Sequence, residues 1–250
     1  MKVPATEAEM SRSFRRALQS GQVHRTHREE ITNSVPELNA QDGIADFVLT
    51  PSDIAGQKLE WVLRLAHSIT TPATANIVAS LRTMAGKSVE RVAMETGLSE
   101  RTVSSILMRI AADNEILRGN FQEGFRLCRA IRDRDIELWA YELKLKNWKR
   151  AMYQALQYKA FAHRVIVVLP TEATRVAISN VPLLKRYGVG LMILNSETDS
   201  VDLLVRPRRS KPKSFGHYLY ALSVFARRGI PNHPAYIGPA KPPRLPKRRV

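Results

Sequence analysis

The chain has 250 residues, 44% of them apolar, which is enough for a buried core in one large domain or two small ones and excludes wholesale disorder. No apolar stretch approaches the ~18 residues of a membrane span, and the first residues turn acidic where a signal peptide would be apolar. The single cysteine, Cys128, excludes a disulfide framework or a Cys-rich zinc site. We therefore expect a cytoplasmic protein with no membrane contact. The formal net charge of +16 favours a polyanionic partner.

Hydrophobic periodicity predicts a mixed α/β frame that is interrupted by a block of helices. Helical spacing begins the chain and returns over the whole of 53–120, whereas alternating or continuous apolar runs mark strands elsewhere. Outside the helical block, the expected helices are 5–20, 147–162, 172–187 and 214–228, and the expected strands are 28–38, 44–49, 134–146, 164–169, 188–195 and 200–207.

Residues 88–112 of the helical block carry the spacing of a helix-turn-helix. Gly97 relieves the strain of the turn, and Ser99 caps a second helix over 100–112. The polar side of that second helix presents Arg101, Thr102, Ser105 and Arg109. The pattern resembles the winged helix-turn-helix family, with 117–127 as the wing, which implies that these four residues contact DNA. A small helical bundle used for dimerisation or packing is the alternative.

The end of the chain has a composition of its own. Residues 206–250 contain 12 Lys and Arg, no Asp or Glu and 8 of the 14 prolines, so the remainder of the chain carries only 27 − 23 = +4. The last part of such a segment cannot bury enough apolar surface to offset its ordering entropy. We expect a flexible basic arm that attracts nucleic acid, with a solubilising extension as the alternative reading.

Three charged residues fall on predicted strands of the α/β frame. Asp46 lies in one strand, and strand alternation puts Glu142 and Lys144 on one face of another. Two carboxylates that converge across neighbouring strands, together with the carbonyl of Leu143, form a hard oxygen site suited to Mg²⁺ or Mn²⁺. A lysine beside it could orient or deprotonate an attacking water and offset the charge that develops on a phosphate.

The order of these pieces resembles the PD-(D/E)XK nuclease superfamily, over residues 5–50 and 134–195. Ala45 stands where the family has the proline of its Pro-Asp motif. The resemblance implies a restriction-endonuclease-like mixed sheet flanked by helices, and Mg²⁺-dependent hydrolysis of phosphodiester bonds. Many members act as dimers that cut both strands, which makes a homodimer one expected arrangement.

The helix that follows Glu142 and Lys144 adds to this resemblance. Gln154 and Tyr158 reproduce the Gln-x-x-x-Tyr of RecB-type nucleases and share a helix face, with Arg150 one turn earlier. By resemblance these three would touch DNA or brace the site. The helix-borne acid of the family would be Glu7, as a fourth catalytic residue and a third acidic metal ligand.

Asp46 and Glu142 are 96 positions apart, whereas neighbouring strands are usually joined by short loops. An insertion at an exposed tip explains the separation, because the ends of such an insertion stay close together. The sequence thus predicts a discontinuous nuclease-like core (1–50 and 131–205), an inserted winged helix-turn-helix domain (51–130) and a basic, Pro-rich C-terminal extension (206–250).

The sequence therefore predicts a Mg²⁺-dependent DNA endonuclease. A DNA-binding transcriptional regulator that uses the nuclease fold as a scaffold is the alternative from another class, and an RNA-binding protein that uses the basic arm is a third. Neither binding protein needs a metal site, so substitution of the carboxylates should leave their affinity largely intact but should abolish the activity of the enzyme.

Overall fold

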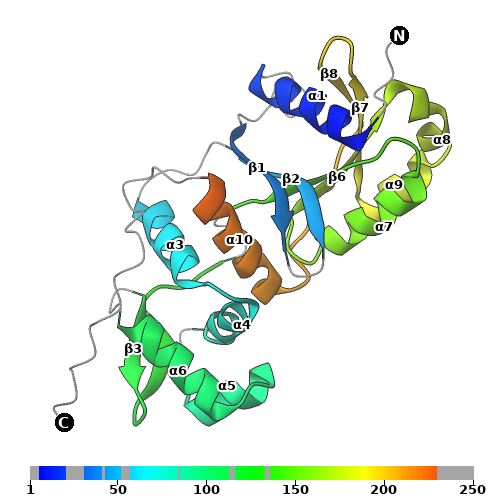
Figure 1. Cartoon of the computed structure of the whole chain (residues 1–250). Coiled ribbons are helices and arrows are strands. Elements are labelled where there is room, and N and C mark those ends of the chain that lie inside the picture. Colours follow the sequence, from blue (N-terminus) through cyan, green and yellow to red (C-terminus); the bar gives the residue numbers. More distant parts are fainter. Residues whose placement is uncertain are drawn as a thin grey trace, which may run out of the picture.

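The computed structural model describes residues 6–20, 31–40, 43–51, 57–83, 85–112, 116–132 and 136–229 (Figure 1). Residues 230–250, where the flexible basic arm was predicted, lie outside the described residues, as do 52–56 and 133–135 at the two predicted junctions of the insertion.

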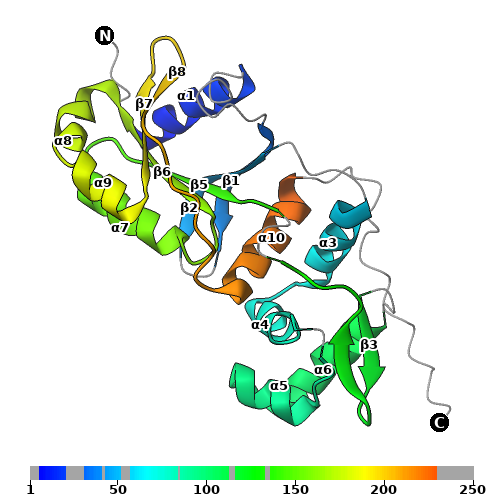
Figure 2. The same ribbon diagram turned by 180° about the vertical axis from the view of Figure 1, so that it is seen from behind.

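Six strands form a mixed sheet in the order β1-β2-β5-β6-β7-β8 (Figures 1 and 2). The β1-β2, β2-β5 and β7-β8 pairs are antiparallel, whereas β5, β6 and β7 run parallel. The strands are β1 (Ile31–Asn39), β2 (Ile44–Pro51), β5 (Trp139–Leu143), β6 (Arg164–Pro170), β7 (Gly190–Asn195) and β8 (Ser200–Val205). The predicted mixed α/β class is confirmed, although β5 is shorter than the predicted 134–146.

Helix α1 (Glu7–Gln19) covers one face of the sheet. It begins at Thr6, whose hydroxyl accepts a hydrogen bond from the Glu9 N–H at 3.2 Å. Its apolar stripe, which includes Met10 and Phe14, packs on Phe47 of β2, with the Phe14 and Phe47 rings 5.2 Å apart at their centroids. Burial of this stripe therefore fixes the position of α1 over the middle strands.

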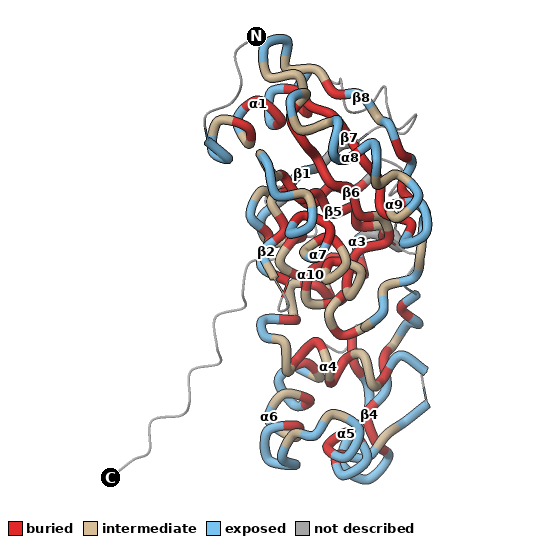
Figure 3. Tube along the Cα trace, turned by 90° about the vertical axis from the view of Figure 1, so that its right-hand side faces the viewer, coloured by how far each residue is buried: buried red, intermediate tan, exposed pale blue. Residues whose placement is uncertain are grey.

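The opposite face of the sheet is covered by α7 (Trp148–Tyr158), α8 (Thr174–Ile178) and α9 (Val181–Tyr187), all of which contribute to one core (Figure 3). The single helix predicted over 172–187 is wrong. A short 3₁₀ turn over Thr171–Ala173 precedes α8, and the chain breaks again before α9. Pro182 explains the second break, because it lies in the first turn of α9 and has no N–H to continue the preceding helix.

The block between β2 and β5 contains four helices and a hairpin among its described residues. The elements are α3 (Gln57–Ser68), α4 (Pro72–Ser80), α5 (Val89–Thr96), α6 (Glu100–Ala111), β3 (Leu117–Asn120) and β4 (Gly124–Leu127). The hairpin occupies the residues predicted as a wing. The prediction of a purely helical 53–120 is therefore wrong at its end, where β3 begins.

Helix α10 (Phe215–Gly229) lies between the sheet and the inserted block (Figures 1 and 2). Its Tyr218 hydroxyl donates to the Ile136 carbonyl at 2.9 Å, and its Arg227 guanidinium donates to the Ile69 carbonyl at the end of α3 at 2.6 Å. One continuous core joins the sheet, α10 and the block. The segment from 206 predicted as an extension thus includes a helix that packs against both parts.

Candidate active site

Asp46, Glu142 and Lys144 meet where strands β2 and β5 separate. The regular pairing of the two strands ends with Phe47 opposite Tyr141. One residue further along, the Asp46 carboxylate replaces the missing backbone partner, because its Oδ2 accepts a hydrogen bond from the Leu143 N–H at 2.7 Å. This bond fixes the Asp46 side chain beside the strand residues that carry the other two groups.

Glu142 is buried, with 1% of its surface exposed. The Tyr158 hydroxyl from α7 lies in short contact with Glu142 Oε2 and 2.6 Å from the Ile44 carbonyl. A phenol has one proton and cannot donate to both oxygens at once. Tyr158 therefore donates to either Glu142 or Ile44 at one time, and donation to the carboxylate favours the ionised form of Glu142.

Lys144 connects Glu142 to helix α1. Its ammonium Nζ lies 3.1 Å from Glu142 Oε1 and 3.3 Å from Glu7 Oε1. The Lys144 side chain is 13% exposed, whereas Glu7 is 57% exposed at the start of α1. The structure thus brings all four predicted catalytic residues into one cluster, with Glu7 at its solvent side.

The carboxyl groups of Asp46 and Glu142 hold protons more tightly than ordinary carboxyls, because their pKa values are raised. Burial raises the pKa of Glu142 to about 7, and repulsion from Asp46 adds to the rise, while Tyr158 and Lys144 oppose it. Burial also raises the pKa of Asp46, against the opposing hydrogen bond from Leu143. Burial alone would lower the pKa of Lys144, but the attraction of Glu142, Glu7 and Asp46 outweighs it and raises that pKa, so the amine stays an ammonium.

The donor set fits a hard divalent cation in its chemistry. Glu142 Oε1 is buried and has the Lys144 ammonium as an ion-pair partner at 3.1 Å, but it accepts no well-directed hydrogen bond from the described residues. Asp46 uses only Oδ2 in its bond to Leu143. Glu7 faces the Lys144 ammonium instead of joining the other two carboxylates. Accordingly, the described part of the chain contains no group of three His, Cys, Asp or Glu arranged to hold a metal. Asp46 and Glu142, with the Leu143 carbonyl between Glu142 and Lys144, would supply the ligands.

The predicted DNA-contacting residues of α7 lie in different environments. Tyr158 is 1% exposed and contacts Glu142, which fits the bracing role and not direct contact with DNA. Gln154 is half-buried with its Oε1 unpaired among the described atoms. Arg150 is exposed, and its N–H is bonded to the Asn147 side chain that caps α7. Only Arg150 is therefore freely accessible from solvent.

Helices α5 and α6 follow the predicted pattern closely. Gly97 ends α5 in the left-handed conformation, with φ +69°, and the Ser99 hydroxyl accepts a hydrogen bond from the Thr102 N–H at 3.2 Å. The exposed side of α6 carries the four predicted residues, Arg101, Thr102, Ser105 and Arg109. Arg109 differs from the other three because its guanidinium donates to Thr74 Oγ1 of α4 at 3.0 Å.

Sequence reasoning missed the Ile44 carbonyl as a partner of Tyr158. The residue type at position 44 does not indicate this contact, because the partner is a main-chain carbonyl. The contact arises only from the position of β2 beside α7 in the fold. It also missed the grouping of Lys159 with the cations of 206–213, although the basic, acid-free composition of 206–213 is visible in the sequence.

The chain matches no model of a known protein family, no curated protein and no solved structure. Among the described residues, no helix combines the length and apolarity that a membrane crossing requires.

Proposed function

We propose that the protein is a Mg²⁺-dependent DNA endonuclease with a restriction-endonuclease-like core. One observation carries this proposal. Asp46 precedes Glu142 and Lys144 by more than 90 residues in sequence, yet the three side chains meet where two strands separate. Burial of two carboxyls and an amine in one place is costly unless they serve as partners or bind a ligand. The PD-(D/E)XK pattern of the sequence supplies the chemistry in which these three types occur together.

Each residue of the cluster has a task in this reaction. When bound, a divalent cation polarises a phosphate oxygen and lowers the pKa of an attacking water. Asp46 and Glu142 would hold it, and Tyr158 would fix the orientation of Glu142 through its hydroxyl. Lys144 remains charged, so of its two predicted roles the orientation of water and the offset of developing phosphate charge fit better than proton abstraction.

The inserted block would bind the substrate as a winged helix-turn-helix. The exposed start of α6 offers Arg101, Thr102 and Ser105 to the edges of base pairs. The β3-β4 hairpin stands beside α6 as a wing would. These features support DNA as the partner.

The test is cleavage of linear, supercoiled and single-stranded DNA in Mg²⁺, Mn²⁺ or EDTA. We expect cutting that requires metal and is lost in Asp46→Asn and Lys144→Ala. Glu172→Gln removes an exposed carboxylate from the turn before α8 and serves as the matched control, with cleavage unchanged. Cutting that persists in Asp46→Asn, or that proceeds in EDTA, would show that this cluster is not the active site.

A DNA-binding regulator is the second candidate, and the pairing of Glu142 favours it. Lys144 and Tyr158 already occupy both oxygens of this carboxyl, as they would in a purely structural ion pair. A regulator would bind DNA equally well as wild type, Asp46→Asn and Lys144→Ala, in EDTA, and none of the three would cut in any metal.

A further inference from the structure

A basic segment crosses the molecule between the sheet and α10. Residues 206–213, which we call the basic strap, contain five cations and no acid. Hydrogen bonds hold the backbone of the strap and of the next residue in place: the Arg208 N–H donates to the Gly188 carbonyl, Ser210 to His163, Lys213 to Lys159, and Ser214 to Ala160, over 2.9–3.2 Å. The strap therefore presents its side chains from a fixed backbone, which reduces the entropy lost on binding.

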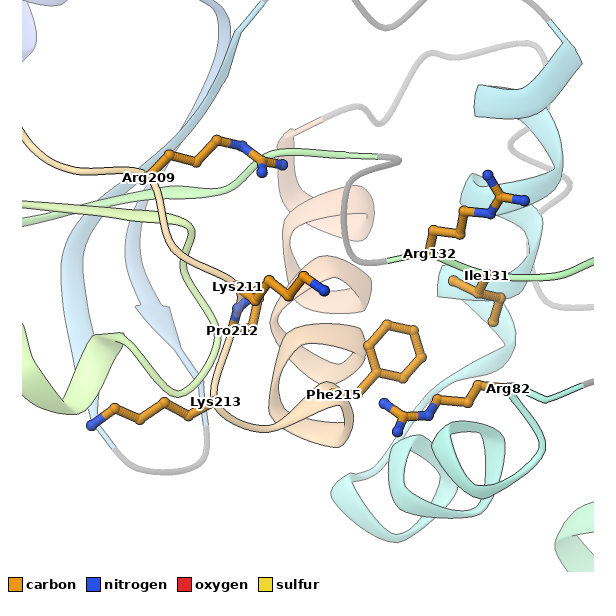
Figure 4. Close-up of a pocket in the computed structure, with 8 residues that line it drawn as sticks. All are labelled: Arg82, Ile131, Arg132, Arg209, Lys211, Pro212, Lys213 and Phe215. Atoms are coloured by element: carbon orange, nitrogen blue, oxygen red, sulfur yellow. The ribbon is translucent and has the colours of Figure 1, made fainter.

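The strap forms one wall of a cleft of about 530 Å³ between the sheet and the inserted block (Figure 4). Its cations are Arg82, Arg132, Arg209, Lys211 and Lys213, and none of the described residues that line it is acidic. Ile131, Pro212 and Phe215 supply the apolar part of the lining. Figure 4 shows Lys211 extending toward the interior while Lys213 points away.

Among the described residues, one carboxylate pairs with a cation of this cleft. Glu137 pairs with Arg209 at 2.8 Å and with Arg164 at 2.7 Å, so one acid is shared by two arginines. Arg82 lies over the Phe215 ring, 5.7 Å from its centroid. Within the described residues, neither Arg82 nor Lys211 forms an ion pair. The cleft thus keeps a positive potential.

A second group of cations adjoins the same strap. Lys159 and Arg208 both flank Gly188, where an added Cβ would lie 3.2 Å from Arg208 Nε and 3.6 Å from Lys159 Nζ. Burial lowers the pKa of Lys159, and the nearby Arg208 and Lys213 lower it further. An anion at this position would relieve the repulsion among the three cations.

The cleft continues toward the inserted helices. A neighbouring cavity of about 420 Å³ shares Arg82 and Phe215 with it and extends to Thr96 at the end of α5. The acid in that cavity, Glu95, is paired with Lys87 at 2.7 Å and Arg91 at 2.8 Å. Together the two cavities form an extended path, which suits a chain of phosphates better than a single small anion.

We propose that this cleft binds the sugar-phosphate backbone of DNA, with Arg82 and Lys211 as phosphate contacts. The proposal rests on the proposed function for its choice of DNA. Glu137, which pairs with Arg209 of the cleft, precedes β5 by two residues, and the same strand carries Glu142.

The test measures affinity without cleavage, by fluorescence anisotropy of a labelled 30-base-pair duplex in EDTA over a series of KCl concentrations. A lost phosphate contact reduces the salt slope by about 0.9, which is roughly eightfold in affinity at 0.1 M salt. We expect Lys211→Gln to weaken binding roughly eightfold and the Arg82→Gln/Lys211→Gln double variant about sixtyfold. Arg175→Gln, which removes an exposed cation from α8 at the far end of the sheet, should change neither affinity nor slope.

Lys211 is exposed and contributes to no core, so its single variant tests the cleft even where Arg82→Gln weakens the packing on Phe215. Affinity of both cleft variants equal to that of Arg175→Gln would overturn the proposal. Loss of heparin or duplex RNA binding with DNA affinity unchanged would overturn it too. Lost DNA binding in a protein that never cuts supports the cleft and refutes the nuclease. Metal-dependent cutting by the wild type, together with unaltered DNA binding by the cleft variants, would support the nuclease and refute the cleft as a DNA-binding site.

Discussion

Replacement of Glu142 by Gln should stabilise the folded protein by an amount that grows as the pH rises above 4.5 and levels off above about pH 7. Glutamine keeps the size and hydrogen-bonding capacity of a protonated carboxyl but does not ionise. In the wild type, burial and the proximity of Asp46 raise the Glu142 pKa from 4.5 to about 7. The folded state therefore holds this proton more tightly than the unfolded chain does.

The sign and size of the effect follow from that difference. A carboxyl with a raised pKa contributes stability that is fully present below its unfolded pKa and is lost as the pH rises through its folded pKa. A shift from 4.5 to about 7, at about 1.4 kcal/mol per pKa unit, corresponds to a loss of about 3 kcal/mol by pH 8. The Gln variant avoids this loss. Lys144 does not interfere, because its raised pKa lies above the window.

The assay is urea denaturation of both proteins in EDTA from pH 4.5 to pH 8. We expect the difference in unfolding free energy to be small at pH 4.5 and to grow in favour of Glu142→Gln toward pH 8. Glu172→Gln, an exposed change, should show no such growth. A difference that stays flat with pH, or that favours the wild type at pH 8, would refute the reasoning, since Glu142 would then be ionised through its attraction to Lys144.

Three further predictions concern the site and the inserted block. Mg²⁺ at a hundred times its dissociation constant should stabilise the wild type at pH 7 by about 2.7 kcal/mol, as a thermal shift that Asp46→Asn abolishes. Tyr158→Phe removes a hydroxyl that favours the ionised form of Glu142, so the pH midpoint of metal-dependent activity should rise, and unfolding should become about 1–2 kcal/mol easier in urea. Gly97→Ala places a side chain at φ +69° with no atom within 4 Å of the new Cβ, so a calorimetric melt should show a loss of about 1 kcal/mol that comes from the backbone alone.

Local patterns predicted the parts of the site that depend on local structure. Strand alternation placed Glu142 and Ala140 on one face and Tyr141 on the other, and the structure agrees: Ala140 packs in one core together with Tyr158, the partner of Glu142, and Tyr141 packs in the other. Capping chemistry located Gly97 and Ser99 to the residue, because a left-handed turn and an N-cap each require particular side chains. Both rules act over a few residues and do not depend on the rest of the fold.

Long-range partners were harder to predict. Pro182 explains the break before α9 and is visible in the sequence, but the apolar residues around it recur at helical spacing and predicted one continuous helix. A helix over 214–228 was predicted and forms as α10, but it was placed in a basic extension because charge dominates its surroundings, although Tyr218, Leu222 and Phe225 recur at helical spacing and are buried. The Ile44 carbonyl and the shared cleft come from tertiary contacts that no single segment encodes.

The segment 206–229 links the two parts of the molecule in more than one way. Helix α10 fixes the inserted block against the sheet through Tyr218 and Arg227, and the strap that precedes it supplies cations to the cleft between them. A DNA duplex bound by the block would then meet the candidate active site at a fixed distance, because α10 packs against both parts. In the proposed enzyme, binding by the block therefore raises the effective concentration of DNA at Glu142. Weakening of α10 packing should reduce cleavage more than it reduces the affinity of the block itself.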